Sequence, residues 1–331
     1  MISYTVRPKL PPDTWEDYLV TAPPYSIAID GAVCAGPRHD YSIPLLCLNH
    51  HEDCDRGATL ATCQQGQHKI RMGLFKGPFR NENGDPTANI DARDCDHDVA
   101  LTTWQLLNHE RCEPAMNQLI NALVAVIGTL DATAGAYPYP DTLELMRKAD
   151  WIFDPYMRFR LSGEIDELDG DAYRAVIENI CLRIDAYVAG RAQIIVVNKR
   201  YDVLQVEDGW KMVHEIGTGA RRRLFADGID AFLSVRQRQD GSHTVSVCRR
   251  SDSVNDFEVP YIIQALNEEE GLTTSRDRWG GSDTASGSPR VGGTHLSIPQ
   301  MTKVVNRCVQ ETRAKIASRR QERSSRIILA R

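Results

Sequence analysis

The sequence has no hydrophobic run long enough to cross a lipid bilayer. Its longest apolar stretch, residues 119–127, is much shorter than the roughly 20 residues that a membrane-spanning helix needs. Residues 1–8 also lack the apolar core and small-residue cleavage site of a signal peptide. With 42% hydrophobic and 25% charged residues, the composition is that of a globular protein. We therefore expect a cytoplasmic protein with no membrane partner.

The cysteines give little support to thiol chemistry. The nine cysteines are an odd number, are scattered, and include no Cys-x-x-Cys pair. This pattern argues against a disulfide framework and against a thiolate zinc knuckle, so most cysteines should be reduced and buried. His51 and Cys54 have a His-x-x-Cys spacing that could begin a zinc site, but no partner pair follows. Oxygen and imidazole ligands fit any metal site better.

Charge is distributed unevenly along the chain. The formal net charge is −6, yet residues 313–331 carry seven Lys or Arg residues against Glu322 alone, a local charge of +6 that leaves −12 elsewhere. Such a basic tail could contact phosphates or an acidic neighbour, or it could be the solvated end of a helix. A structural protein that docks a partner through this helix is therefore one functional alternative.

The order of predicted elements indicates an α/β fold, and 331 residues suffice for about two domains. Strands are expected at 25–30, 45–48 and 87–91, and helices at 57–67, 99–107, 115–130, 141–151 and 171–188. From about residue 192 the pattern becomes β-rich, with strands at 193–198, 201–206, 211–216, 229–237 and 244–249, a hairpin turn at Asp240-Gly241 and a helix at 260–267. We expect an N-terminal, mostly parallel sheet with flanking helices and a smaller C-terminal α+β domain. The predicted divisions are an irregular lead-in at 1–24, a metal-binding α/β domain at 25–190, a substrate-binding domain at 191–298 and a terminal helix with a basic tail at 299–331.

Acids and imidazoles recur where predicted strands and helices end. They come from four separate places in the chain: Asp30, the pair His50 and His51, the pair Asp94 and Asp96, and Asp131. Open α/β sheets place their chemistry beyond the carboxyl ends of strands, so these side chains could converge. Asp98 precedes an apolar helical pattern, and we interpret it as the helix N-cap rather than as a ligand.

A converging set of acids and imidazoles suits manganese or magnesium, and neutral imidazole tolerates manganese better. Two such ions held close together could activate a water molecule and bind the oxygens of a phosphoryl group. The alternative is that His50 and His51 merely satisfy hydrogen bonds in a loop.

A polar, glycine-rich segment at residues 276–295 is the second chemical feature. Its glycines expose backbone N–H groups, and Arg278 and Arg290 flank them, so the segment could bind an anion. The candidate substrate-binding residues are Arg278, Gly280, Gly281, Ser282 and Arg290. A flexible loop without a ligand is the alternative.

Together these motifs resemble the DHH phosphoesterase superfamily. Asn49-His50-His51 is similar to its Asp-His-His signature, Asp94-Cys95-Asp96 to its Asp-x-Asp motif, and 131–137 to its Asp-Thr-Gly-x-Phe segment. The strand at 244–251 followed by Gly280–Gly287 is similar to the substrate-binding domain associated with the family. The chain is a divergent variant, because Asn49 replaces an aspartate, Asp283 stands near the family's histidine, and the motif order is permuted.

The resemblance implies a manganese- or magnesium-dependent phosphohydrolase, with two ions, acting in a cleft between the domains. Its substrate would be a phosphodiester or small nucleotide, such as a short oligonucleotide or cyclic dinucleotide, and a homo-oligomer is compatible with this reading. The implied metal ligands are Asp30, His50, Asp94, Asp96 and Asp131, and the implied catalytic residues are His50, His51 and Asp96. The alternative is a weakly active or inactive nucleotide- or anion-binding sensor on the same scaffold, which Asn49 and Asp283 would favour.

Overall fold

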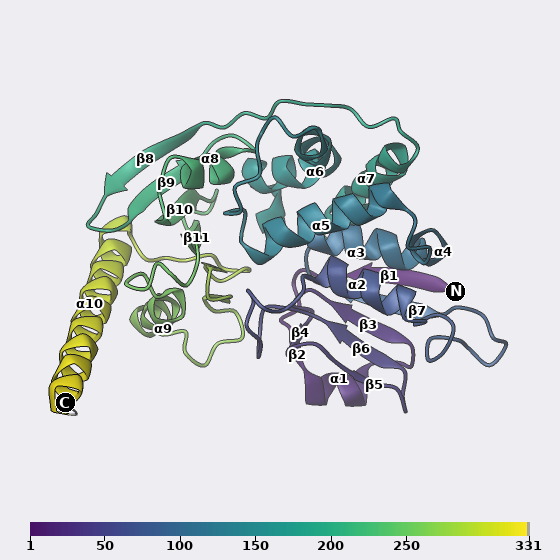
Figure 1. Cartoon of the computed structure of the whole chain (residues 1–331), viewed down its shortest axis with the longest axis horizontal. Helices are drawn as coiled ribbons and strands as arrows, with labels where there is room; N and C mark the ends of the chain where they lie inside the picture. Colours follow the sequence, from purple (N-terminus) through teal and green to yellow (C-terminus); the bar gives the residue numbers. More distant parts are fainter. Residues whose placement is uncertain (330–331) are drawn as a thin grey trace. The chain divides into compact units, whose positions relative to one another are not determined.

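The computed structural model describes residues 1–329, which form two compact units (Figure 1). The first unit comprises Met1–Lys199 and Gly217–Arg222, and the second comprises Arg200–Ile216 and the chain from Arg223 onward. The α/β class predicted from the sequence is confirmed. No helix within residues 1–329 combines the length and apolar character needed to span a membrane. All nine cysteines are free and six of them are buried, as predicted.

The first unit is built on a five-stranded sheet with the order β1-β7-β3-β6-β5. Its strands are β1 (Ile2–Val6), β7 (Ala88–Ala92), β3 (Ser26–Ile29), β6 (Leu45–Leu48) and β5 (Arg38–Asp40). The four strands from β1 to β6 are parallel, and only β5 runs antiparallel to its neighbour. A small ladder joins β2 (Asp13–Thr14) to β4 (Val33–Cys34).

Both faces of this sheet are covered, which explains the continuous apolar runs of its central strands. Ile27 and Ile29 point into the main core, whereas Ala28 between them packs with Tyr18 of α1 (Trp15–Thr21) on the opposite face. The other helices of the unit, which Figure 1 shows on the side of the sheet away from α1, are α2 (Thr62–Arg71), α3 (His97–Leu107), α4 (His109–Cys112), α5 (Gln118–Ala132), α6 (Glu144–Ser162) and α7 (Gly170–Val188). A 3-10 turn, Glu164–Glu167, links the last two.

The second unit contains a six-stranded sheet with the order β12-β13-β11-β10-β9-β8. Its strands are β8 (Tyr201–Val206), β9 (Lys211–Glu215), β10 (Ala231–Gln237), β11 (His243–Arg249), β12 (Gly280–Gly281) and β13 (Ala285–Gly287). The hairpin predicted at Asp240-Gly241 joins β10 to β11. The helices α9 (Val259–Glu270) and α10 (Ile298–Leu329) contribute apolar side chains to the core of this unit.

Several predicted boundaries need correction. Residues 1–24 are not an irregular lead-in, because β1 pairs with β7 along its whole length. Residues 193–198 form no strand, since no neighbouring strand pairs with them and Ile194 and Val196 are exposed. The helix predicted at 141–151 continues to Ser162 because residues beyond 151, such as Phe159, still pack into the main core.

The division of the chain also differs at two places from the one expected. Residues 191–199 belong to the first unit, and 217–222 return to it from within the β-rich segment. This short return includes the start of a helix that the sequence did not predict, α8 (Ala220–Ala226). The terminal helix is not separate, because Met301, Val304 and Cys308 lie in the second core. The side chains at 324–331, at the end of the predicted basic tail, lie outside the described part.

The position of β7 between β1 and β3 makes Ile90 a test of the corrected fold. Ile90 is buried and pairs with Tyr4 on one side and Ile27 on the other. We expect Ile90→Ala to destabilise the first unit by about 2–5 kcal/mol through loss of apolar contact and cavity formation. Native-state hydrogen exchange of the β7 amides in low urea measures this unit alone. The exposed Val20→Ala serves as a control, and equal exchange in both variants would contradict the packing described.

Candidate metal centre

The candidate site lies at the carboxyl edge of the first sheet. Asp30 directly follows β3 and Asn49, His50 and His51 directly follow β6, and these two strands pair in parallel. Asp30 has a φ of +47° and Gly31 a φ of +76°, so the chain turns sharply as it leaves β3. The sequence therefore brings an acid and two imidazoles to neighbouring strand ends, as predicted.

Asn49 holds this turn together and is fully buried. Its Oδ1 accepts hydrogen bonds from the backbone N–H groups of Gly31, His50 and His51, at 3.1, 2.8 and 3.2 Å. Its Nδ2 donates to two backbone carbonyls, of Val33 and Ala35, and to the Glu52 carboxylate at 2.7 Å. Both ends of the amide are thus engaged in shaping the loop, which leaves Asn49 a structural role rather than that of a ligand.

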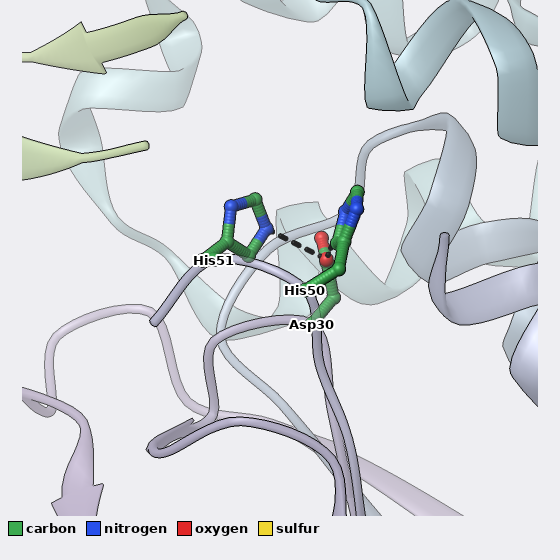
Figure 2. Close-up of side chains that lie close together, drawn as sticks. All are labelled: Asp30, His50 and His51. Carbon is green, nitrogen blue, oxygen red and sulfur yellow. Dashed lines mark hydrogen bonds and ion pairs between the residues drawn. The ribbon is translucent and has the colours of Figure 1, made fainter. Parts of the chain in front are cut away.

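Asp30 contacts both histidines (Figure 2). His51 Nε2 lies 2.8 Å from Asp30 Oδ1, and His50 Nε2 lies 3.5 Å from the same oxygen. Thr62 at the start of α2 also donates its hydroxyl to this oxygen, at 3.2 Å. Burial would raise the pKa of Asp30, but the two imidazoles outweigh it and hold the pKa well below its ordinary value. Asp30 is therefore a charged ligand group in a buried position.

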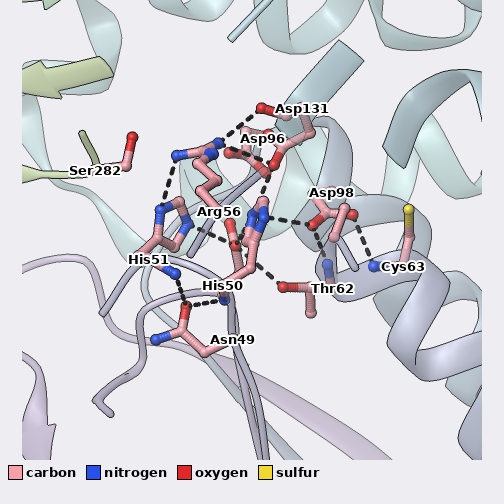
Figure 3. Close-up of polar contacts among 12 residues, drawn as sticks. Asn49, His50, His51, Arg56, Thr62, Cys63, Asp96, Asp98, Asp131 and Ser282 are labelled. Atoms are coloured by element: carbon pink, nitrogen blue, oxygen red, sulfur yellow. Dashed lines mark hydrogen bonds and ion pairs between the residues drawn. The ribbon is translucent and has the colours of Figure 1, made fainter. Parts of the chain in front are cut away.

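Two more carboxylates approach the same imidazole nitrogen (Figure 3). Asp131, in the last turn of α5, places Oδ2 2.7 Å from His50 Nε2, and Asp98 in α3 places Oδ2 3.8 Å from it. Asp98 also accepts the backbone N–H groups of Thr62 and Cys63, at 2.6 and 2.8 Å. The N-cap of α2 is Ala61, which has no side-chain acceptor. The Asp98 carboxylate, from α3, accepts the first N–H groups of α2 in its place.

The predicted N-cap of α3 was wrong by two residues. The helix begins at His97, and Asp96 caps it by accepting the backbone N–H of Val99 at 2.9 Å. Asp98 is the second residue of the helix and is fully buried, so it belongs to the candidate site and does not cap α3. The sequence pattern indicated a cap in this turn but could not say which of the two acids it was.

Two overlapping groups of side chains could hold a metal ion. One comprises Asp30, His50 and His51, and the other comprises His50, Asp98 and Asp131. In each group the ligand atoms lie within 4.8 Å of one another, and His50 belongs to both. Neither group contains a cysteine, so the zinc alternative based on Cys54 gains no support within residues 1–329.

The electrostatics of His50 fit a cation at this place. Both of its ring nitrogens are buried, and Nε2 lies 2.7 Å from Asp131 Oδ2, an ion-pair distance. Burial would lower the pKa of His50, but hydrogen bonding to Asp131 and Asp30, together with the charge of Asp131, outweighs it and raises the pKa to about 10. A proton on His50 thus offsets carboxylate charge that a metal ion could offset instead.

The remaining acids show how much negative charge is concentrated here. Burial, reinforced by the charges of Asp131 and Asp30, raises the pKa of Asp98 to about 6. Burial and the charges of Asp30 and Asp94 raise the pKa of Asp96 well above its ordinary value. Carboxylates that repel one another in a buried place favour protonation or a bound cation.

Arg56 determines which ring nitrogen of His51 accepts a hydrogen bond and which donates one. Its Nη1 lies 3.1 Å from His51 Nδ1, and its Nη2 donates to the Asp131 carboxylate at 3.1 Å and to the Asp131 carbonyl at 2.8 Å. A guanidinium has donors only, so His51 Nδ1 must accept, and the ring hydrogen is on Nε2, where it is donated to Asp30. In this arrangement His51 is a donor, and a metal ion at its Nε2 would end the contact with Arg56.

The predicted site residues are distributed over both units. Asp30, His50, His51 and Asp131 lie in the two metal-binding groups, whereas Asp94 and Asp96 lie in neither. The residues that the sequence missed as part of the site are Arg56, Thr62 and Asp98. Thr62 falls within the stretch predicted to be a helix from residue 57, and Arg56 directly precedes that stretch, whereas α2 begins only at Thr62.

The predicted substrate-binding residues Arg278, Gly280, Gly281, Ser282 and Arg290 belong to the second unit. Gly280 and Gly281 form β12, and Gly281 has a φ of +138°, with no room for a Cβ beside Ser286. Ser282 is buried and donates its hydroxyl to the Ala285 carbonyl, while the Arg278 guanidinium donates to the Thr273 carbonyl. This segment is an ordered part of the second sheet.

Comparison with known proteins gives no relative: no protein-family model, no curated protein and no solved structure matches the chain.

Asn49 provides a test of the site as described. We expect Asn49→Asp to destabilise the first unit by about 3 kcal/mol or more, because the carboxylate cannot donate to the Val33 and Ala35 carbonyls and is repelled by Glu52. Urea unfolding and a manganese titration measure the two effects, with the exposed Asn83→Asp as control. A stable variant that binds manganese more tightly would make position 49 a ligand and contradict this assignment.

Proposed function

We propose that the protein is a divalent-cation-dependent phosphohydrolase that cleaves a phosphodiester or a small nucleotide. The observation that carries the proposal is the buried His50 Nε2, which has carboxylate oxygens of Asp30, Asp98 and Asp131 within 4 Å. The resemblance of the surrounding motifs to the DHH phosphoesterases agrees with this function.

The ligand chemistry favours manganese, with magnesium as the alternative. The two groups offer only carboxylate oxygens and imidazole nitrogens, and imidazole suits manganese better than magnesium. We propose two ions, as the DHH resemblance implies; His50 Nε2 has a single lone pair and would ligate only one of them. The ligands would be Asp30, His50, Asp98 and Asp131.

The chain's own residues would orient the substrate. When bound, the cations would supply Lewis-acid charge that stabilises phosphoryl oxygens and favours ionisation of the attacking water. Arg56 keeps a buried Nε donor that has no partner among the described residues, and its guanidinium already spans His51 and Asp131. We propose that this donor binds a phosphoryl oxygen, and that His51 Nε2–H donates to the substrate or to Asp30.

A binding protein without turnover is the second candidate, and Arg56 favours it. Its guanidinium places a permanent positive charge at Asp131 Oδ2, the oxygen nearest His50, and would compete with a cation there. A sensor would need only to bind a nucleotide or another phosphate-containing ligand, whereas a hydrolase must hold its cations as well. Arg278 and Arg290 as further substrate contacts stay predictions in either case.

Metal binding should release protons from His50. The imidazole must be neutral to ligate a cation, and its pKa is raised to about 10, so binding near pH 8 should displace about one proton. Apparent manganese affinity should therefore increase as pH rises from 7 towards 10 and level off above it. Calorimetry in buffers of different ionisation enthalpy measures the released proton. Binding with no proton release, or no binding, would remove His50 as a ligand.

Hydrolysis should depend on Asp131. We expect manganese-dependent cleavage of at least one member of a panel of short oligonucleotides, cyclic dinucleotides and pyrophosphate, and a loss of about a hundredfold or more in kcat/KM for Asp131→Asn, which removes ligand charge worth several kcal/mol. The exposed Asp53→Asn, in the loop that follows His51, is the matched control.

The outcomes of this assay separate the candidates. Ligand binding without product would favour the sensor. Product formed equally by the wild type and Asp131→Asn would assign the activity to a contaminant and remove the hydrolase proposal.

A further inference from the structure

The strand β8 is the outer edge of the second sheet and pairs on one side only, with β9 (Figure 1). Three of its apolar side chains are substantially exposed: Val203 at 43%, Leu204 at 49% and Val206 at 67%. An exposed apolar edge strand is a template for pairing with another chain, and proteins usually shorten, charge or cover such edges.

The register with β9 places two of these apolar residues, Val203 and Val206, on one face of the sheet. Val203 pairs with Val213 but Gln205 pairs with Met212, so Leu204 is an extra, bulged residue. Residues that pair across two strands point to the same face of the sheet. Their partners Val213 and Met212 are adjacent in β9 and therefore point to opposite faces, so Val203 and Gln205 also lie on opposite faces. Gln205 shares its face with Met212, which belongs to the core formed with α9 and α10. The opposite face carries Tyr201, Val203 and Val206.

The backbone of β8 leaves hydrogen-bonding groups on its free edge. The Arg200 carbonyl accepts the N–H of Ile216 at 3.1 Å, and the Glu207 N–H donates to the Trp210 carbonyl at 3.0 Å. Residues 200 and 207, at the two ends of the strand, therefore direct their hydrogen-bonding groups toward β9. Because these groups alternate along a strand, those of Tyr201 and Val206 point away from β9.

The sequence of β8 is self-complementary in antiparallel pairing. If Val203 lies opposite Leu204 of a second copy, Tyr201 lies opposite Val206, and both residues of that pair direct hydrogen-bonding groups outward. The same register places Asp202 opposite Gln205 and brings Arg200 opposite Glu207 at each end. The bulge makes this possible, since without it residues 201 and 206 would direct their groups to opposite sides.

We propose that β8 is a homodimer interface, in which two copies of this chain pair antiparallel through their β8 edges to form one continuous sheet. The charge pattern favours a second copy of this chain as the partner, because Arg200 of each copy lies opposite Glu207 of the other copy. A slip of two residues in one direction would place Asp202 opposite Glu207, a repulsive pair, and a slip in the other direction would place Arg200 opposite Gln205 and lose both ion pairs, so charge favours this register. The apolar side chains of Val203, Leu204 and Val206 are covered in the same step.

A charge swap on the full chain tests both the surface and the register. By sedimentation velocity over a concentration series, Arg200→Glu and Glu207→Arg should each raise the dimer dissociation constant at least about tenfold, and the double variant should restore it to within about threefold. Glu269→Arg, an exposed charge reversal on α9, should leave it unchanged.

A second variant addresses the backbone. Val206→Pro removes an N–H that points to the free edge and leaves the bonds to β9 intact, so it should abolish the dimer without changing the far-UV circular dichroism. A wild-type protein that stays monomeric up to about 1 mM would overturn the proposal. So would a dimer that tolerates Val206→Pro, or single charge variants that the double variant does not rescue.

Discussion

Buried negative charge at the carboxyl edge of the first sheet constrains everything around it. Carboxylate oxygens of Asp30, Asp98 and Asp131 all lie within 4 Å of His50 Nε2; His50, Asp30 and Asp98 are buried, and Asp131 is partly exposed. Such charges repel one another strongly at low dielectric constant, so the fold must provide positive charge or keep protons on the acids. The pKa of Asp98, raised to about 6, and the pKa of His50, raised to about 10, both result from this constraint.

The two adjacent histidines meet this constraint in different ways. His50 is fully buried among carboxylates and balances their charge with a proton, which a cation can replace. His51 donates from Nε2 to Asp30, because Arg56 can only donate to its Nδ1. Of the two adjacent residues, His50 is suited to bind a cation and His51 is suited to donate a hydrogen bond. The difference comes from Arg56, which lies outside the Asn49-His50-His51 motif.

The sequence predicted those parts of the site that depend on local pattern. Apolar runs that end in polar residues indicated the strands leading to Asp30 and to His50, and parallel neighbours bring such ends together. Asp98 was assigned to the wrong role because its partners are the backbone N–H groups of α2, 35 and 36 residues away in the chain. The strand β1 was missed for a similar reason: it is specified by pairing with β7, more than 80 residues later.

The same distinction bears on Asn49, which stands where the resemblance to the DHH phosphoesterases would place an aspartate. A carboxylate at position 49 could accept the three backbone N–H groups but could not donate to the Val33 and Ala35 carbonyls, so it would leave the Ala35 carbonyl with only the Cys47 thiol and the Val33 carbonyl with only the Ala35 N–H. The negative charge that Asn49 lacks is present at Asp98 and Asp131, which reach His50 from helices. A neutral residue in the signature is thus compatible with a cation site, because the amide builds the loop while carboxylates from elsewhere supply the charge.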